Sequence, residues 1–179
     1  MKTVDHRRLI FIDESGAKTN MTRLYGRAFD GRRVCDAVPH GHWCMTTMVS
    51  AIGLNGPRSP FVFGGAMDAD AFRIYVERVL VPELQTGDIV VMDNLSSHKD
   101  AHARQMITGA GALVWDLPPY SPDFNPIEQM WSKVKAFLRE AKARTEQTLI
   151  RAIGKAFTKI TQDDCAGWFR DAGYLDGKT

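Results

Sequence analysis

The sequence Ile89-Val90-Val91-Met92-Asp93 is an unbroken apolar run that leads directly into an aspartate. Near the N-terminus, Leu9-Ile10-Phe11-Ile12-Asp13 repeats the pattern. Apolar runs of this length predict strands that are covered on both faces, as at the centre of a sheet with helices on either side. Each aspartate would then stand at the end of a central strand, which is where α/β folds place their ligands.

The sequence around the two runs predicts further strands and a series of helices. Additional strands are expected at Arg23–Phe29, Met45–Ile52, Phe61–Phe63 and Ala112–Trp115. Helices are expected from an N-cap at Asp68 to near Pro82, and at His98–Ile107, Pro126–Lys142, Glu146–Ile160 and Asp164–Asp171. Strands that come first and then alternate with helices indicate an α/β domain with a mixed sheet flanked by helices.

Length and composition predict one globular domain. The 179 residues are 44% hydrophobic and 25% charged, which is ordinary for a soluble protein of this size. No apolar run approaches the roughly 20 residues that span a bilayer, and the stretch Leu9–Ile12 is too short for a signal peptide. Three cysteines form no paired spacing. We therefore expect a cytoplasmic protein with reduced thiols and no membrane partner.

The two aspartates that follow the apolar runs suit a divalent cation. Carboxylate oxygens are hard ligands, and Mg²⁺ or Mn²⁺ binds them readily. For a single aspartate, capping of the following turn is the simpler explanation. Because Asp13 and Asp93 share the same context, metal binding explains the pair as well as turn capping does.

Glu128 supplies a third carboxylate at the start of a predicted helix. Asn125 suits the N-cap, Pro126 the first helical position, and Glu128 the third. The same pattern is typical of a capping box, which would give Glu128 a structural role. Helical spacing places Glu128 beside the apolar face, on the same side as Ser132, Lys135, Arg139 and Lys142. That arrangement would also suit a metal ion next to a phosphate backbone.

Three segments resemble the conserved motifs of DDE transposases. Phe11–Ser15 is similar to the first-aspartate strand, Asp93–His98 to the second-aspartate motif, and the proline-rich Leu117–Trp131 to the glutamate motif. Thirty-four residues separate Asp93 from Glu128, a spacing that resembles the Tc/mariner superfamily and, most closely, its bacterial insertion-sequence branch. The resemblance covers about residues 8–174.

This resemblance implies a fold, a reaction and a cofactor. The fold would be ribonuclease-H-like, with a central mixed five-stranded sheet flanked by helices. Asp13, Asp93 and Glu128 would be the catalytic and metal-binding triad, holding two Mg²⁺ (or Mn²⁺) ions per active site, with Asp13 bridging both. The reaction would be hydrolysis at the transposon ends, followed by transfer of the freed 3′-hydroxyl into target DNA without a covalent protein intermediate.

Supporting residues are expected around the triad. Asn94 and His98 could orient a ligand or contact phosphate, although His98 equally suits a polar helix start. Asn125 would position Glu128 by capping its helix. Four basic residues of one predicted helix are candidates for contact with the DNA backbone, although they could equally form an ordinary exposed helix face: Lys133, Lys135, Arg139 and Lys142.

The resemblance also implies partners and a domain organisation. We expect a single catalytic domain over residues 1–179, with a core at about 8–174, acting in the bacterial cytosol as a homodimer assembled on transposon ends and target DNA. Family members usually carry an N-terminal helix-turn-helix region. The first strand begins here at about Leu9, so we expect that region to be absent. The chain could be a second reading frame, a fragment or a decayed copy, and a separate partner chain or reading frame could supply end recognition.

Three alternatives remain open at this point. One is a ribonuclease-H-like nuclease that shares the triad but lacks strand transfer. Another is a catalytically idle DNA-binding remnant of a decayed element. A haloacid-dehalogenase-like phosphatase with Asp13 as nucleophile is disfavoured, because that chemistry needs a second aspartate where Ser15 stands.

Overall fold

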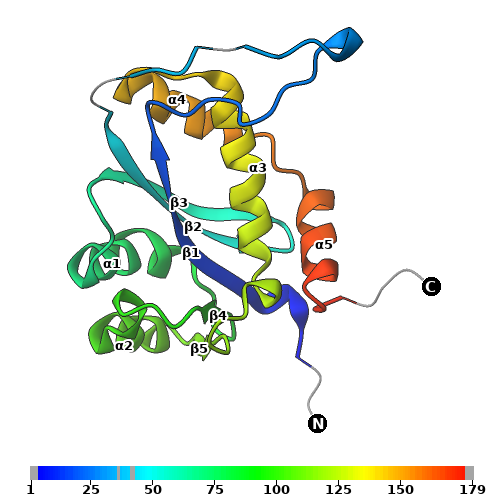
Figure 1. Ribbon diagram of the computed structural model, residues 1–179. Helices are drawn as coiled ribbons and strands as arrows, with labels where there is room; N and C mark the ends of the chain where they lie inside the picture. Colours follow the sequence, from blue (N-terminus) through cyan, green and yellow to red (C-terminus); the bar gives the residue numbers. More distant parts are fainter. Residues whose placement is uncertain (1–3, 36, 41–42, 176–179) are drawn as a thin grey trace.

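A mixed five-stranded sheet forms the centre of the computed structural model, which describes residues 4–35, 37–40 and 43–175 (Figure 1). Its strands are β1 (Leu9–Lys18), β2 (Met45–Gly53), β3 (Gly56–Gly64), β4 (Ile89–Met92) and β5 (Leu113–Asp116). The spatial order is β3-β2-β1-β4-β5. Neighbouring strands are antiparallel from β1 to β3 and parallel from β1 through β4 to β5. The predicted sheet is thereby confirmed, with the two apolar runs as its central strands.

Helices cover both faces of this sheet (Figure 1). One face carries α1 (Ala69–Tyr75), which continues through a π-helical turn, and α2 (Ala101–Gly109). The other carries α3 (Pro126–Ala141), α4 (Glu146–Phe157) and α5 (Gln162–Asp171). The described ranges contain no helix with the length and apolar content needed to cross a membrane.

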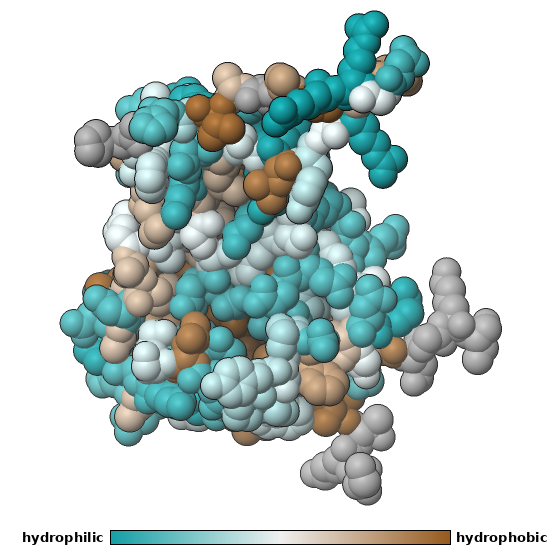
Figure 2. Space-filling view, in the orientation of Figure 1, coloured by the Kyte–Doolittle hydropathy of each residue, from teal (hydrophilic) through white to brown (hydrophobic). Residues whose placement is uncertain are grey.

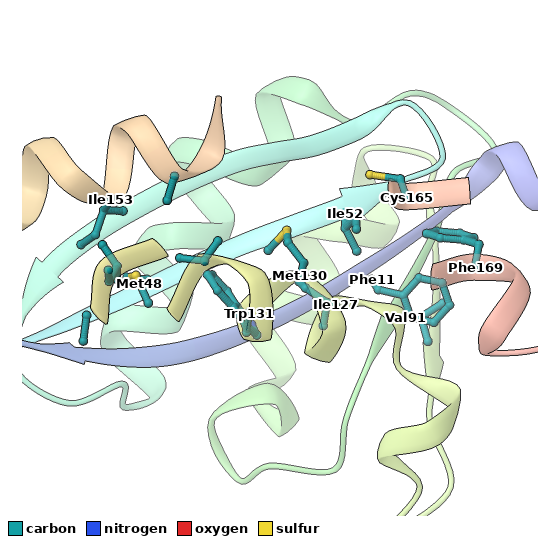
Figure 3. Close-up of a cluster of buried hydrophobic side chains, with 14 of the residues drawn as sticks. Phe11, Met48, Ile52, Val91, Ile127, Met130, Trp131, Ile153, Cys165 and Phe169 are labelled. Carbon is teal, nitrogen blue, oxygen red and sulfur yellow. The ribbon is translucent and has the colours of Figure 1, made fainter. Parts of the chain in front are cut away.

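Successive side chains of β1 point to opposite faces of the sheet and so belong to both halves of the core. Leu9 and Phe11 belong to the cluster under α3, α4 and α5, whereas Ile10 and Ile12 belong to the cluster under α1 and α2. Figure 3 shows Phe11 beside the side chains of α3 and α5. Its ring meets Phe169 edge to face, with 5.3 Å between centroids. The same alternation places the side chain of residue 13 on the α3 side of the sheet.

The first strand is longer than predicted. Asp13 was expected at the end of its strand, but β1 continues to Lys18, where it pairs with Met45 of β2. The additional residues are polar or small, so their sequence carries no apolar signal, and the antiparallel partner supplies the hydrogen bonds that keep them extended. By contrast, β4 ends at Met92, which leaves Asp93 at a strand end as predicted.

The predicted strand at Arg23–Phe29 is wrong. Within the described part of the connection between β1 and β2, the only regular element is a 3₁₀ turn at Phe29–Gly31. Side chains in this segment are exposed, Tyr25 by 91%. A β-favouring composition does not form a strand without a partner to pack against. Figures 1 and 2 show the segment projecting from the body of the protein with hydrophilic side chains reaching into solvent.

Other differences concern the ends of elements. The predicted Phe61–Phe63 segment is part of the nine-residue β3, which contains Pro57 and Pro60 because it is an edge strand. The helix expected from His98 begins at Ala101, after a 3₁₀ turn at Ser97–Lys99. The helix expected to end at Ile160 ends at Phe157.

The helix start at the Asp68 N-cap is confirmed, since its side chain accepts a hydrogen bond from the Ala71 amide at 2.8 Å.

Candidate active site

The register of the central strands places Asp13 and Asp93 side by side. In the parallel pair β1–β4, Phe11 lies opposite Val91, and the same register continued for two residues aligns Asp13 with Asp93. Adjacent strands lie about 4.8 Å apart. Phe11 and Val91 both pack in the cluster under α3, and alternation along β1 directs Asp13 toward that helix.

Glu128 stands in the first turn of that helix. Pro126 opens α3, and the buried Ile127, Met130 and Trp131 fix the helix against the sheet (Figure 3). Glu128 itself is exposed, and its amide donates to the Asn125 carbonyl at 3.1 Å. The helix therefore presents this carboxylate at the edge of the sheet where β4 ends.

The buried Asp13 lies near other carboxylates. Asp13 is only 6% exposed. Burial raises its pKa to about 8, and the negative charges of Glu128, Glu14 and Asp93 contribute in the same direction. A carboxylate in this position favours its neutral form until a positive charge is brought to it.

His98 links Asp93 to a residue that the sequence did not single out. Its Nδ1 lies 2.6 Å from Asp93 Oδ1, and its Nε2 lies 3.0 Å from Glu14 Oε2. The ring is fully buried against Phe72, with 4.6 Å between centroids. Burial lowers the pKa of His98, but the two carboxylates more than offset that effect and raise it to about 9. The histidine is therefore an imidazolium at neutral pH that donates to both carboxylates.

His98 was predicted as a supporting residue, and the structure shows its contacts with Asp93 and Glu14. Glu14 itself was not predicted. The only sequence signal for Glu14 is its position directly after Asp13. Its partner His98 lies 84 residues away in the chain, and local patterns carry no information about such a contact.

The hydrogen bonds of Asp93 fall on one of its two oxygens. His98 and the Leu95 amide both donate to Oδ1, the latter at 2.9 Å. Burial raises the pKa of Asp93, but these hydrogen bonds bring it below its usual value. Oδ2 has no hydrogen-bond partner among the described residues. An ionised carboxylate with one fixed oxygen and one open oxygen is well suited to bind a cation.

The loop after β4 is held on two sides. Arg104 Nε donates to the His98 carbonyl at 2.9 Å, and its guanidinium also pairs with Asp116 at the end of β5. Asn94 Nδ2 donates to the Leu117 carbonyl at 2.6 Å. Asn94, predicted as a supporting residue, therefore joins the loop after β4 to the loop after β5.

A cleft of about 550 Å³ opens beside these groups. It is lined by Asp93 and Glu128, by the proline-rich loop around Tyr120, and by Asn125. Asn125 occupies the predicted N-cap position of α3, but its side chain makes no capping hydrogen bond, so the capping box with Glu128 does not form. The buried Oδ1 of Asn125 has no hydrogen-bond partner in the described structure.

The candidate carboxylates do not form a complete metal site among the described residues. Among residues 4–35, 37–40 and 43–175, no three His, Cys, Asp or Glu side chains are grouped so that they could hold a metal ion as they stand. The donor chemistry nevertheless fits a hard divalent cation. Burial and, after it, neighbouring negative charges raise the pKa of Asp13, Asp93 has one oxygen without a hydrogen-bond partner among the described residues, and Glu128 lines the cleft.

The predicted DNA-backbone residues separate into two groups. Lys133 Nζ lies 2.5 Å from Asp164 Oδ2 of α5, so this lysine is held in an intramolecular ion pair. Lys135 and Arg139 form no ion pair with a described residue. Lys142 ends α3 in a left-handed conformation, with φ 48°. Together with Glu128, these last three lie on one side of the helix.

Solved structures share this fold. The Mos1 strand transfer complex matches with a TM-score of 0.65 and 16% identity, covering 96% of this chain and 56% of the Mos1 chain. A Mos1 paired-end complex with Mg matches with a TM-score of 0.54 and 18% identity, covering 94% and 57%. The catalytic core domain of BIV integrase matches with a TM-score of 0.54 and 14% identity, covering 85% and 82%. The chain thus spans little more than half of the Mos1 chains.

The sequence also matches a protein family over most of its length. No curated protein matches it, but the family described as DDE superfamily endonuclease matches residues 8–150. That range contains all three candidate carboxylates and every strand of the sheet. The chain belongs to the DDE superfamily of endonucleases.

Proposed function

We propose that this chain is the catalytic domain of a transposase that cleaves DNA at transposon ends and joins the freed 3′-hydroxyl to target DNA. One observation carries the proposal: Asp93, at the end of β4, and Glu128, in α3, line an open cleft, and the charges of both raise the pKa of the buried Asp13 of β1. Membership of the DDE superfamily supports the same chemistry.

We further propose that the three carboxylates are the catalytic residues and hold two Mg²⁺ or Mn²⁺ ions. The fold match to a Mos1 complex with Mg supports this choice of ion. Such ions, when bound, activate a water and stabilise the negative charge that develops on the attacking and leaving oxygens of a phosphodiester. Asp13, the most buried of the three, would contact both ions.

The protein's own residues prepare this site. The His98 imidazolium fixes Oδ1 of Asp93 and leaves Oδ2 without a hydrogen-bond partner among the described residues. Asp13, whose pKa is raised by burial and by neighbouring carboxylates, would be ionised when it holds a cation. No residue acts as a covalent nucleophile, because water and then the 3′-hydroxyl attack phosphorus directly.

The proposed substrates are duplex transposon ends and target DNA. The matched Mos1 structures are strand transfer and paired-end complexes of that protein. For this chain, we propose that two copies assemble on two DNA ends. Light scattering should give the molar mass of two protein chains plus DNA when DNA is added. Without DNA, it should give a smaller protein mass.

The test is Mn²⁺-dependent cleavage of transposon-end DNA by the wild type and by Asp93→Asn. We expect the variant to lose cleavage by at least about a thousandfold (at 25 °C about 4 kcal/mol in the barrier) while its thermal unfolding is retained. Asp163→Asn is the matched control, because it removes an exposed carboxylate on α5 away from the cleft. Equal cleavage by the wild type and Asp93→Asn would refute the catalytic assignment.

A pre-cut substrate with a free 3′-hydroxyl separates the proposed transposase from a nuclease of the same fold. Joining of that end to target DNA by the wild type supports the transposase. Cleavage without joining would favour the nuclease, and DNA binding without either reaction would favour an idle remnant.

A further inference from the structure

A second cleft lies at the opposite end of α3 from Glu128. It has a volume of about 560 Å³ and lies where the C-terminal end of α3 meets the first turns of α4. No acidic residue lines it, whereas four basic residues do: Lys142, Arg144, Arg151 and Lys155. The active-site reaction proposed above does not use this cleft.

The positive charge of this second cleft is concentrated. The whole chain carries a formal net charge of only +2, yet four cations share this one hollow. Arg151 and Lys155 stand one helical turn apart on α4, a spacing at which like charges repel each other. Neither forms an ion pair with any carboxylate of the described residues. An anion in the cleft would offset that repulsion.

One of the four cations is held in place by the backbone. Arg144 Nη1 donates to the carbonyls of Thr19 and Met21, at 3.2 and 3.0 Å. These carbonyls are neutral, so the guanidinium keeps its full charge while losing its freedom to move. A fixed guanidinium loses less conformational entropy on binding an anion than a mobile one does.

The second cleft continues a line of residues that begins at the active site. Glu128, Ser132, Lys135, Arg139 and Lys142 follow one another along α3 at spacings of four and three, which places them on one side of the helix. The distance from Glu128 to Lys142 along the helix is about 21 Å, at 1.5 Å per residue. Phosphates of one DNA strand are about 3.4 Å apart along the duplex axis, so this length corresponds to about six base pairs.

We infer that the second cleft, defined by Lys142, Arg144, Arg151 and Lys155, binds the phosphate backbone of duplex DNA about six base pairs from the bond that is cut. The position of the cut rests on the proposed function, whereas the binding of the backbone does not. The contact is independent of base sequence, because basic side chains that reach only phosphates read no base edge. Its purpose is to hold the duplex in line with α3.

The experiment measures binding of a fluorescent 30-base-pair duplex by anisotropy at a series of salt concentrations. The test variant is Arg151→Ala/Lys155→Ala, and the matched control is Arg78→Ala/Lys159→Ala, which removes the same charge from exposed positions outside the cleft. Each lost phosphate contact reduces the slope of log K against log salt by about 0.9. We expect a slope reduced by about 1.8 and a several-fold weaker affinity in the test variant only.

Folding does not obscure this result. Arg151 and Lys155 are exposed on a helix, and alanine favours helix, so we expect the thermal unfolding of the test variant to match that of the control. Equal salt slopes in the test and control variants, with both folded, would overturn the inference.

A second arm separates this inference from the proposed function. Mn²⁺-dependent cleavage by the wild type is measured beside the salt slopes of the two variants. If the wild type fails to cleave but the salt slope changes as expected, the proposed function falls and the DNA cleft stands. If the wild type cleaves and the slope does not change, the cleft falls and the function stands.

A third arm tests the position of the cleft. Duplexes that end about three base pairs from the cut should bind the wild type and the test variant equally, whereas duplexes that extend ten base pairs should bind the wild type more tightly. A difference that is as large on the short duplex as on the long one would place the cleft elsewhere on the DNA and refute the assigned distance.

Discussion

His98 Nδ1 lies 2.6 Å from Asp93 Oδ1, so a fully buried imidazolium fixes one oxygen of a candidate metal ligand. The second ring nitrogen is held by Glu14. Carboxylate ligands depend on such outer partners for their orientation, and removal of a partner typically costs ten- to a hundredfold in metal affinity or activity. The contact therefore determines which oxygen of Asp93 is left free of hydrogen bonds within the described structure.

Replacement of this histidine should weaken the use of metal more than it weakens the fold. In His98→Ala we expect the Mn²⁺ concentration for half-maximal cleavage to rise about ten- to a hundredfold. This concentration should rise less in His98→Asn, because the side-chain N–H of asparagine can still donate to Asp93. It should rise least in Glu14→Gln. Cleavage rates over a Mn²⁺ titration measure the effect. Identical Mn²⁺ dependence in wild type and His98→Ala would contradict a positioning role.

Asp13 should make the metal-free protein less stable as the pH rises. Its pKa is raised to about 8 by burial and by neighbouring carboxylates, against 3.8 for an unperturbed group. Between these values the unfolded chain has lost the proton and the folded protein keeps it, so the free energy of unfolding falls as pH increases from about 4 to 8.

Asp13→Asn should therefore be more stable than the wild type at pH 7 without metal, by a few kcal/mol at most, with little difference at pH 4. Added Mn²⁺ should raise the melting temperature of the wild type but not of the variant. Thermal unfolding at both pH values, with and without Mn²⁺, measures this. If the stability of Asp13→Asn relative to the wild type does not increase between pH 4 and pH 7, that result would argue against the raised pKa of Asp13.

Trp131 anchors the helix that carries Glu128. Its side chain is 1% exposed, and its ring meets Phe157 edge to face at 6.0 Å. Trp131→Ala should lower the free energy of unfolding by about 3–5 kcal/mol. Trp131→Phe should cost clearly less, because the buried indole Nε1 has no hydrogen-bond partner among the described residues. Denaturant titration of both variants measures this, and equal losses would contradict it.

The basic residues of α3 should separate by role. Lys133 pairs with Asp164, whose pKa is lowered to about 2 by that hydrogen bond, so Lys133→Ala should leave DNA affinity unchanged and cost at most about 1 kcal/mol of stability. Lys135→Ala/Arg139→Ala should instead weaken DNA binding and reduce its salt slope by up to about 1.8. Anisotropy measures the slopes, and a larger slope change in Lys133→Ala would reverse the assignment.

Much of the architecture could be predicted because its signals are local. The apolar run Ile89–Met92 can only be buried between layers, the N-cap Asp68 satisfies amides within its own turn, and Pro126 suits the first position of a helix. Such signals depend on residues a few positions apart, so they do not depend on how distant parts of the chain pack. The candidate carboxylates Asp13, Asp93 and Glu128 were found in the same way, from the segments that contain them.

The tertiary structure alone decided what depends on distant partners. β1 continues to Lys18 because β2 pairs with it, and Arg23–Phe29 forms no strand because no neighbour is available to it in the described structure. The bridge from Glu14 through His98 and the basic second cleft likewise join segments that are remote in the chain. Sequence patterns encode which surfaces must be buried, but only the packed sheet and helices determine which of those surfaces meet.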